Sequence, residues 1–373
     1  MATTGTEYEI VFVEQDGVLE VTLANGARAR NIVLRNRSQF ESRICAGARF
    51  AASLINIEGP ARNPTRMELH IERQIIKIDG TGLGQDFWIL PETLTLIEAD
   101  IHFGRAFRLV GPKGTGKTTF ASLLAKTFNV PYLKVDGTGV SKPQDLFGSA
   151  SAKNASTEWV PSDLANFITA HQHSKRWPKA FVCLDEFSRM GHSMAPFHAL
   201  FDHTGQFSFT TTQGTVVITG LDGIIFILTD NPVGPGYIGN QALDSAMDDR
   251  VEAYAFEYPP ASWEIPWLVS MTGITELEAT HIVQVAGAIR VKAVELGSDK
   301  GGPSPRRTLR VAEDVSIGTP MQLSVASRII DRYPDGDAQS EREILKAHLK
   351  GLSLLSDATH RMRTLVSVAD MGN

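Results

Sequence analysis

The stretch "LVGPKGTGKTTFAS", residues 109–122, decides the fold of this chain of 373 residues. It contains the pattern G-x-x-x-x-G-K-[ST], which chance would produce in only about two of a hundred chains of this length and composition. The residues before it, "AFRLV" (106–110), are typical of a buried strand, and apolar residues follow Thr118 at helical spacing. A strand, a glycine loop and a helix in this order predict a phosphate-binding loop, or P-loop.

The P-loop predicts a site for a nucleoside triphosphate. The backbone N–H groups of residues 113–118 are expected to surround a phosphate at the positive end of the helix. Lys117 is expected to reach the β- and γ-phosphates, and the Thr118 hydroxyl is expected to bind Mg²⁺. The candidate nucleotide-binding residues are Gly111, Pro112, Lys113, Gly114, Thr115, Gly116, Lys117, Thr118 and Thr119.

Two further apolar strands end in polar residues that hydrolysis would need. The run "AFVCL" leads into Asp185 and Glu186. We expect Asp185 to hold Mg²⁺, largely through its waters, and Glu186 to orient and polarise the attacking water. The run "IIFIL" leads to Asn231, whose side chain is expected to hold the same water or the γ-phosphate.

Arginines later in the chain are candidates for contacts with the phosphates. Arg250 follows two acids, just before the last predicted strand, and its alternative is a surface pair with Asp248 or Asp249. The segment "SPRRTL" contains Arg306 and Arg307, and either could touch the nucleotide. Arg306 is the candidate that we carry forward.

The composition is that of a soluble globular protein, with 42% apolar and 21% charged residues. No apolar run approaches eighteen residues, so no membrane span is expected. The N-terminus lacks the features of a signal peptide. Cys45 and Cys183 are too few for a disulfide framework or a zinc site. Together these features favour a cytoplasmic location.

Three domains are expected along the chain. Residues 1–80 read as a small β-rich accessory domain, in which an Asp16-Gly17 turn joins the first two strands. Residues 81–260 alternate strands and helices, the pattern of a parallel sheet covered on both faces. Residues 261–373 should form a mainly helical lid. The five buried strands of the middle domain are expected at 106–110, 132–135, 180–184, 224–228 and 253–258.

The charge distribution bears on nucleic-acid binding. The net charge of −6 argues against it for the molecule as a whole. The segment from Thr22 to Arg66 is an exception, because it carries eight arginines against Glu41 and Glu58, a local balance of 8 − 2 = +6. Two interpretations stay open, a solvated sheet face, which we favour, and a patch that grips phosphates.

These motifs, in this order, resemble the AAA+ ATPases of the MoxR branch. Within that branch they are most similar to the ATPases that activate bacterial rubisco and nitric oxide reductase, and then to the cobaltochelatase small-subunit ATPases. The resemblance covers about residues 87–325 and includes "DLFG" (145–148), "RVEAYAFEYPP" and "SPRRTL". It implies an α/β fold with a parallel sheet of strand order 5-1-4-3-2, followed by a helical lid.

The resemblance also implies a role for each candidate residue. By this resemblance Asn231 lies between the P-loop and Asp185, Arg189 faces a neighbouring subunit, and the segment 207–218 is a β-hairpin directed toward the pore of a ring. The implied roles are Walker A for Lys117 and Thr118, Walker B for Asp185 and Glu186, sensor 1 for Asn231, arginine finger for Arg250 and sensor 2 for Arg306.

The implied function is that of a Mg²⁺-dependent ATP hydrolase that forms a ring, expected to be a hexamer, and remodels a protein partner. Such a partner often carries a von Willebrand A domain. ATP rather than GTP follows from the resemblance alone. The alternative is a nucleic-acid-directed motor or loader that uses the basic N-terminal segment, and the lack of a helicase signature argues against it. A nucleotide-gated scaffold is a third interpretation, against which Glu186 and Arg250 count.

Overall fold

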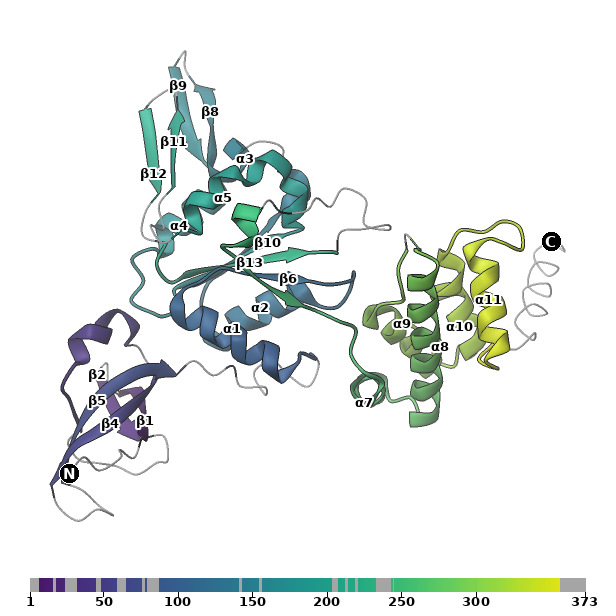
Figure 1. The fold of residues 1–373 in the computed structure, drawn as a ribbon, viewed down its shortest axis with the longest axis horizontal. Helices are drawn as coiled ribbons and strands as arrows, with labels where there is room; N and C mark the ends of the chain where they lie inside the picture. Colours follow the sequence, from purple (N-terminus) through teal and green to yellow (C-terminus); the bar gives the residue numbers. More distant parts are fainter. Residues whose placement is uncertain are drawn as a thin grey trace.

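The computed structural model describes residues 7–15, 18–23, 32–44, 48–58, 65–75, 78, 87–140, 143–153, 156–202, 207–211, 214–218, 221–232, 243, 245–298 and 300–355. The predicted Asp16-Gly17 turn and Cys45 lie outside these residues. The described chain forms an N-terminal sheet, a central α/β unit and a C-terminal group of helices, which we call the lid (Figure 1). Among the described helices, none combines the length and the apolar character needed to cross a bilayer.

The N-terminal sheet has five strands in the order β2-β1-β4-β5-β3. All pairs are antiparallel except β3 with β5. Alternate residues of a strand face the same side, so Ile10 and Phe12 of β1 enter the core together with Phe50 and Leu69. The strands are β1 (Glu7–Gln15), β2 (Val18–Leu23), β3 (Ile32–Leu34), β4 (Arg49–Glu58) and β5 (Arg66–Ile75), with a 3₁₀ helix, η1 (Arg37–Arg43), before β4.

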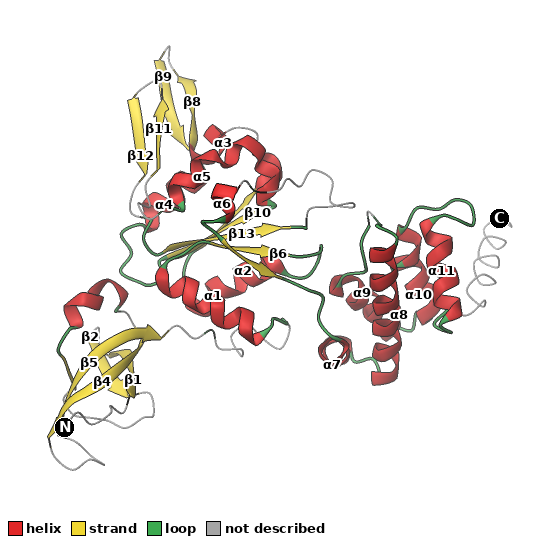
Figure 2. Cartoon of the chain, in the orientation of Figure 1, coloured by secondary structure: helices red, strands yellow, loops and turns green. Residues whose placement is uncertain are grey.

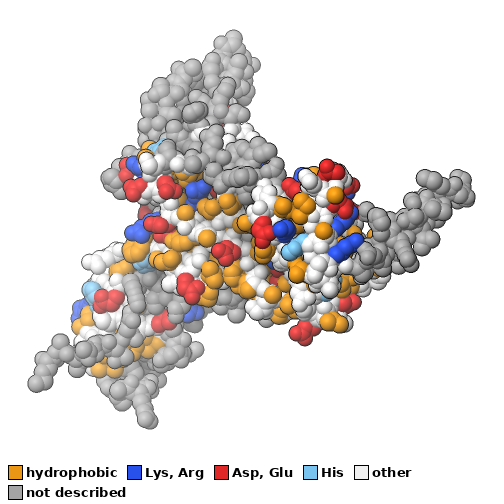
Figure 3. Space-filling model, turned by 45° about the vertical axis from the view of Figure 1, so that its right-hand side comes forward, with side chains coloured by type: hydrophobic (Ala, Val, Ile, Leu, Met, Phe, Trp, Pro, Cys, Tyr) orange, Lys and Arg blue, Asp and Glu red, His pale blue; other side chains and the backbone are white. Residues whose placement is uncertain are grey.

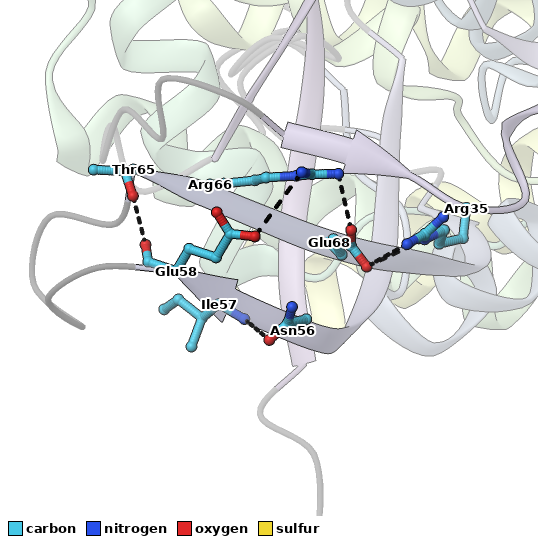
Figure 4. Close-up of polar contacts among 7 residues, drawn as sticks. All are labelled: Arg35, Asn56, Ile57, Glu58, Thr65, Arg66 and Glu68. Atoms are coloured by element: carbon cyan, nitrogen blue, oxygen red, sulfur yellow. Dashed lines mark hydrogen bonds and ion pairs between the residues drawn. The ribbon is translucent and has the colours of Figure 1, made fainter.

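Three arginines of this part of the chain, Arg35, Arg49 and Arg66, are paired with carboxylates, which for Arg35 and Arg49 come from a neighbouring strand. Glu68 accepts hydrogen bonds from Arg35, at 2.7 Å, and from Arg66, at 3.0 Å (Figure 4). Arg49 donates to Glu9 at 2.8 Å. Both acids lie outside the arginine-rich segment of the sequence, so a count over that segment alone overstates its positive charge.

The central unit is a five-stranded parallel sheet of order β14-β6-β13-β10-β7. Numbered along the unit, this order is 5-1-4-3-2. The middle strands β10 and β13 are buried on both faces, which explains their continuous apolar sequences. The strands are β6 (Phe107–Val110), β7 (Tyr132–Asp136), β10 (Ala180–Asp185), β13 (Ile224–Asp230) and β14 (Glu252–Ala255).

Helices cover both faces of the central sheet (Figure 2). On one face, α1 (Pro91–Phe103) and α2 (Lys117–Phe128) pack Ile101 and Phe120 against Phe181 of β10. On the other face, α4 (Asp163–His171) and α5 (Ala195–Leu200) pack against alternate residues of the same strands. The remaining short elements are η2 (Gly137–Gly139), α3 (Pro143–Phe147), η3 (Phe187–Met194) and α6 (Ser245–Asp248).

The two edge strands differ from the expected buried strands. β14 ends at Ala255, three residues earlier than expected at 258, and its side chains are mostly exposed. β7 alternates half-buried and exposed side chains. Among the described strands each edge strand has one neighbour, and the helices cover the middle of the sheet, so the prediction that these two strands are buried is wrong.

Two β-hairpins extend from the same side of the central sheet (Figure 2). The predicted hairpin of residues 207–218 is confirmed, because β11 (Phe207–Thr211) pairs antiparallel with β12 (Gly214–Ile218). A second hairpin was not predicted. It pairs β8 (Gly148–Lys153) with β9 (Ser156–Pro161), and its small polar side chains gave no strand-like alternation of apolar residues.

The lid follows β14 through the segment Tyr258-Pro259-Pro260. Its longest helix begins at a capping box, in which Thr275 and Glu278 bind each other's backbone N–H groups. The lid helices are α7 (Ala261–Thr272), α8 (Glu276–Glu295), α9 (Pro305–Ser316), α10 (Met321–Arg328) and α11 (Glu341–Gly351), with η4 (Ile330–Arg332) before α11.

A buried ion pair ties three lid segments together. The guanidinium of Arg290, on α8, donates two hydrogen bonds to Glu264, on α7, at 2.8 and 3.0 Å. Its Nε donates to the carbonyl of Pro303 at 2.9 Å. Thr308, on α9, donates to Glu264 at 2.6 Å, and the ring of Tyr258 lies 4.5 Å from the guanidinium carbon. The start of α9 is therefore fixed relative to α7 and α8.

Replacing Arg290 by Met should destabilise the protein strongly, because it leaves the fully buried carboxylate of Glu264 without its cation. Loss of one partner of a buried pair costs about 3–5 kcal/mol of unfolding free energy. Arg328→Met is the matched control, since Arg328 also binds a carboxylate, Asp314, through two hydrogen bonds but is exposed to water. Denaturant unfolding should show a much smaller loss for the control. Equal losses would contradict the importance of the buried pair.

Candidate functional site

A cavity of about 560 Å³ lies at the carboxyl ends of the central strands, where the P-loop, the sheet and the lid meet. Polar side chains dominate its lining. The lining residues are Lys113, Gly114, Lys117, Thr118, Thr119, Ser122, Tyr132, Lys134, Asp185, Glu186, Thr229, Asp230, Asn231 and Arg306.

The P-loop connects the end of β6 to the first turn of α2. Gly114 and Gly116 adopt positive φ angles of 81° and 90°, which side chains rarely allow. A Cβ at Gly116 would lie 2.6 Å from the ring of Phe87, and a Cβ at Gly114 would overlap Ser304 of the lid. The loop therefore needs glycine at both positions, and its backbone N–H groups remain near the helix N-terminus, where an anion can bind.

Lys117 is held inside the P-loop. Its ammonium donates to the carbonyls of Gly111, at 2.6 Å, and Pro112, at 2.9 Å, and to Oδ1 of Asn231 at 3.3 Å. Burial lowers the pKa of Lys117 to about 8, although the nearby Asp185 and other carboxylates oppose this shift. A phosphate in the cavity would supply the negative charge that the buried ammonium lacks.

Asp185 stands at the end of β10 and receives three donors. Its Oδ1 accepts from the hydroxyls of Thr118, at 2.8 Å, and Thr229, at 2.5 Å. Its Oδ2 lies 2.6 Å from the ammonium of Lys134. Burial raises the pKa of Asp185, but the hydrogen bonds from Lys134, Thr229 and Thr118 outweigh it, so the pKa lies below its usual value. The site therefore holds an ionised carboxylate.

Thr118 and Asp185 fit the requirements of a Mg²⁺ site. Both offer oxygen, the ligand that Mg²⁺ prefers, and the two oxygens lie 2.8 Å apart. Mg²⁺ usually takes one or two ligands from the protein and the rest from phosphates and water. A cluster of three or more His, Cys, Asp or Glu side chains suited to a metal is absent from the described residues.

Glu186 follows Asp185 in a left-handed backbone conformation, with φ at 54°. Its Oε2 lies 2.8 Å from Nε of Arg189, yet this oxygen has no well-aligned hydrogen bond within the described residues. The carboxylate lines the cavity. Within the chain Arg189 contacts Glu186, and the expectation that it faces a neighbouring subunit stays a prediction.

The end of β13 is anchored by a buried ion pair. Asp230 accepts from Nε of Arg108, on β6, at 2.7 Å, and from the backbone N–H of Ser188, after β10, at 2.7 Å. Asn231, the next residue, is buried beside the ammonium of Lys117. Asp230 thus joins three parts of the sheet edge and fixes the position of Asn231.

The candidate arginines occupy different places. Arg306, in the first turn of α9, lines the cavity, whereas Arg307 is not among the lining residues. Arg250 is exposed and does not line the cavity, and its Nη1 donates to the carbonyl of Ala246 at 2.6 Å. The cavity of one chain therefore brings together Arg306 and the strand-end residues, but not Arg250.

A second, smaller cavity of about 210 Å³ lies between the P-loop and the lid. Four aromatic side chains line it, namely Phe87, Trp88, Trp263 and Trp267. The rings of Trp263 and Trp267 are stacked, with centroids 5.4 Å apart. The indole N–H of Trp267 is buried and has no acceptor in the described part of the chain. Flat apolar surfaces with a donor suit a nucleobase.

The comparison with protein families agrees with this geometry. Residues 106–250, from just before β6 through Arg250, match the profile of the AAA domain, dynein-related subfamily. This part of the chain is similar to an AAA domain. The match supports an AAA+ ATPase, an enzyme that binds and hydrolyses ATP, and it spans neither the N-terminal sheet nor the lid. No curated protein matches the chain.

The cavity contains residues that sequence reasoning missed. Thr229 and Asp230 precede Asn231 in the polar run "TDN" at the end of a strand, a signal that was available. Lys134 gave no such signal, because it lies within a strand. Among the P-loop candidates, Lys113, Gly114, Lys117, Thr118 and Thr119 line the larger cavity, Gly114, Thr115, Gly116 and Thr119 line the smaller one, and Gly111 and Pro112 bind Lys117.

Replacing Trp263 by Ala should weaken the binding of ATP but not of inorganic tripolyphosphate, which has no base. Loss of stacking on one aromatic ring costs about 1–3 kcal/mol, so the affinity for ATP should fall about tenfold or more. Calorimetric titration of both ligands gives the comparison, with Trp159→Ala, outside both cavities, as the control. An equal loss for tripolyphosphate would rule out the small cavity as the base site.

Proposed function

We propose that this protein is a Mg²⁺-dependent ATPase that forms a ring, expected to be a hexamer, and uses hydrolysis to remodel a protein partner. One observation carries the proposal. Lys117, Thr118, Asp185 and Glu186 converge on one cavity, while the exposed Arg250 stays outside it. This arrangement supports a site that is nearly complete in one chain and is completed by another.

Binding of the triphosphate is assigned to the P-loop and to the lid. Lys117 and the loop N–H groups are suited to the β- and γ-phosphates, since the ammonium is buried and its hydrogen bonds within the described residues go to two carbonyls and an amide. Arg306 is suited to contact the phosphates from the lid side of the same cavity. Cations on both sides would orient the phosphate chain before reaction.

The metal is assigned to Thr118 and Asp185. When bound, Mg²⁺ neutralises charge on the β- and γ-phosphate oxygens. The hydroxyl of Thr229 fixes the orientation of the Asp185 carboxylate, because it donates to the same oxygen as Thr118. The carboxylate of Asp185 is therefore ionised and correctly oriented before the metal binds.

Hydrolysis is assigned to Glu186 and Asn231. The carboxylate of Glu186 is suited to accept a hydrogen bond from water and so to increase its nucleophilicity. The amide of Asn231, fixed by its neighbour Asp230, is suited to hold the same water or the γ-phosphate. Arg189 limits the movement of Glu186 until a water molecule competes for the carboxylate.

Arg250 is assigned as the arginine finger of the neighbouring subunit. Negative charge spreads over the γ-phosphate oxygens in the transition state, and an arginine supplied to that charge is worth about 10³ to 10⁵ in rate. Arg250 is exposed, and its described hydrogen bond goes to a backbone carbonyl of its own turn. Its charge is therefore available to another chain.

The protein partner and the MoxR branch are the finer parts of the proposal. The "DLFG" segment and the hairpin of β11 and β12 support the branch, and the hairpin is expected to face the pore of the ring. A partner with a von Willebrand A domain follows from the same resemblance. These assignments rest on sequence segments, and the ATPase core does not depend on them.

A nucleic-acid-directed motor or loader is the alternative. It has less support, because Arg35, Arg49 and Arg66 of the N-terminal sheet are paired with carboxylates. On the face seen in Figure 3, acidic and basic side chains of the described residues are interspersed. Binding to a phosphate backbone favours a continuous basic surface, and this face offers none among the residues described.

Replacing Glu186 by Gln should leave ATP binding intact and slow hydrolysis about 10²-fold or more, because the amide keeps the shape but cannot polarise water as a carboxylate does. Steady-state phosphate release measures turnover, and nucleotide titration measures binding. Glu252→Gln, on the exposed edge strand β14, is the matched control and should hydrolyse normally. Wild-type turnover in the Glu186 variant would contradict its role.

Mixing two inactive variants tests the shared site. Arg250→Ala should bind ATP without hydrolysing it, whereas Lys117→Ala should fail to bind. Mixed rings should regain activity, since an intact Arg250 from the second variant meets an intact P-loop of the first. Turnover per subunit should rise with protein concentration as rings form.

The control for the mixing experiment is Arg105→Ala, an exposed arginine outside the cavity, which should be fully active alone. Normal hydrolysis by Arg250→Ala alone would contradict the assignment of Arg250. Full activity of the wild-type protein as a dilute monomer would contradict the ring.

A further inference from the structure

Lys134 is a residue of the cavity to which the proposed function assigns no role. It lies on the edge strand β7, in register with Cys183 of β10, two residues before the end of that strand. Its side chain is 43% exposed and lines the cavity. Its ammonium lies 2.6 Å from Oδ2 of Asp185.

The contacts of Asp185 divide between its two oxygens. Oδ1 accepts from the hydroxyls of Thr118 and Thr229, and Oδ2 faces Lys134. A hydrated Mg²⁺ bound beside Thr118 needs this same carboxylate, because the waters of the metal donate hydrogen bonds to carboxylate oxygens. An ammonium on Oδ2 and the hydrated metal therefore compete for one group.

The other charged groups near Lys134 and Asp185 have hydrogen-bond or ion-pair partners of their own. Asp136, the acid at the end of β7, accepts from the backbone N–H and the hydroxyl of Thr138, at 2.9 and 2.7 Å. Asp230, the neighbouring buried acid, is already paired with Arg108. Lys117 donates to carbonyls and an amide within the P-loop instead. Lys134 is thus the cation in direct contact with Asp185 among the described residues.

We propose that Lys134 is a tethered cation that occupies Asp185 in the absence of Mg²⁺, is displaced by the hydrated metal, and so sets the Mg²⁺ concentration at which nucleotide binds tightly. This inference rests on the proposed function, since it takes Asp185 as the group that faces the metal. The exposed stem of Lys134 lets the ammonium leave Asp185 for solvent or for the phosphates. A merely structural ion pair would affect stability and leave the Mg²⁺ dependence unchanged.

The test is a Mg²⁺ titration of nucleotide binding rather than of hydrolysis. The affinity for ADP carrying a fluorophore on its ribose is measured in EDTA and at increasing Mg²⁺, for the wild type and for Lys134→Met. In EDTA the variant should bind more weakly, because the carboxylate of Asp185 then repels the phosphates without compensation. As Mg²⁺ is added, the ADP affinity of the variant should reach half of its maximal increase at a lower Mg²⁺ concentration than that of the wild type. The difference should be about threefold or more, the size expected for one partly exposed charge pair.

Two further variants make the result specific. Lys134→Arg keeps a cation on the same strand and should restore a midpoint close to that of the wild type. Lys113→Met removes a lysine that lines the same cavity from the P-loop. It should weaken binding by a similar factor in EDTA and in Mg²⁺, without moving the midpoint.

The outcomes separate this inference from the proposed function. Failure of the wild-type protein to bind ADP under any condition would overturn the proposed function and this inference with it. Normal ADP binding with the same Mg²⁺ midpoint in the wild type and in Lys134→Met would overturn the role of Lys134 alone. Should Lys134→Met fail to fold by circular dichroism, Lys134→Gln, which keeps a hydrogen-bond donor without the charge, replaces it in the same titration.

Discussion

The parallel register of β6, β13 and β10 is the constraint on which the site depends. It places Asp185 opposite Thr229, and Asp230 opposite Val110, the residue from which the P-loop departs. Because parallel strands end at the same edge of the sheet, three separate stretches of sequence deliver polar groups to one place. The buried pair of Arg108 with Asp230 resists any slip of this register, since a shift by one residue would leave a charge buried without its partner.

The sequence predicted those parts of the molecule that local pattern determines. Glycine spacing and apolar runs were enough to find the P-loop and the strands that lead to Asp185 and Asn231, because these strands are buried on both faces. Lys134 could not be found in this way. Its importance comes from the strand order, which places β7 beside β10, and no local pattern records which strands are neighbours.

Local sequence patterns do not record which strands are neighbours, and this also explains why the ion pairs of the N-terminal sheet and the β8–β9 hairpin were not predicted. The carboxylates of Glu9 and Glu68 reach their arginines across paired strands, so a count along the chain could not detect the neutralisation. The sequence of the β8–β9 hairpin consists largely of small and polar residues, so it shows no alternation of apolar residues that would predict a strand. The edge strands β7 and β14 look apolar in sequence but have fewer neighbours than the central strands.

The two prolines between the sheet and the lid have a mechanical consequence. Each pyrrolidine ring fixes one φ angle, so Pro259 and Pro260 remove two of the few rotations that could swing the lid. Beyond them, the pair of Arg290 with Glu264 makes the base of the lid rigid. A rigid lid joined to the sheet by a restricted segment can move in few directions. We therefore expect a small displacement of Ser304 and Arg306 against the P-loop to move the lid helices together, rather than to rearrange them locally.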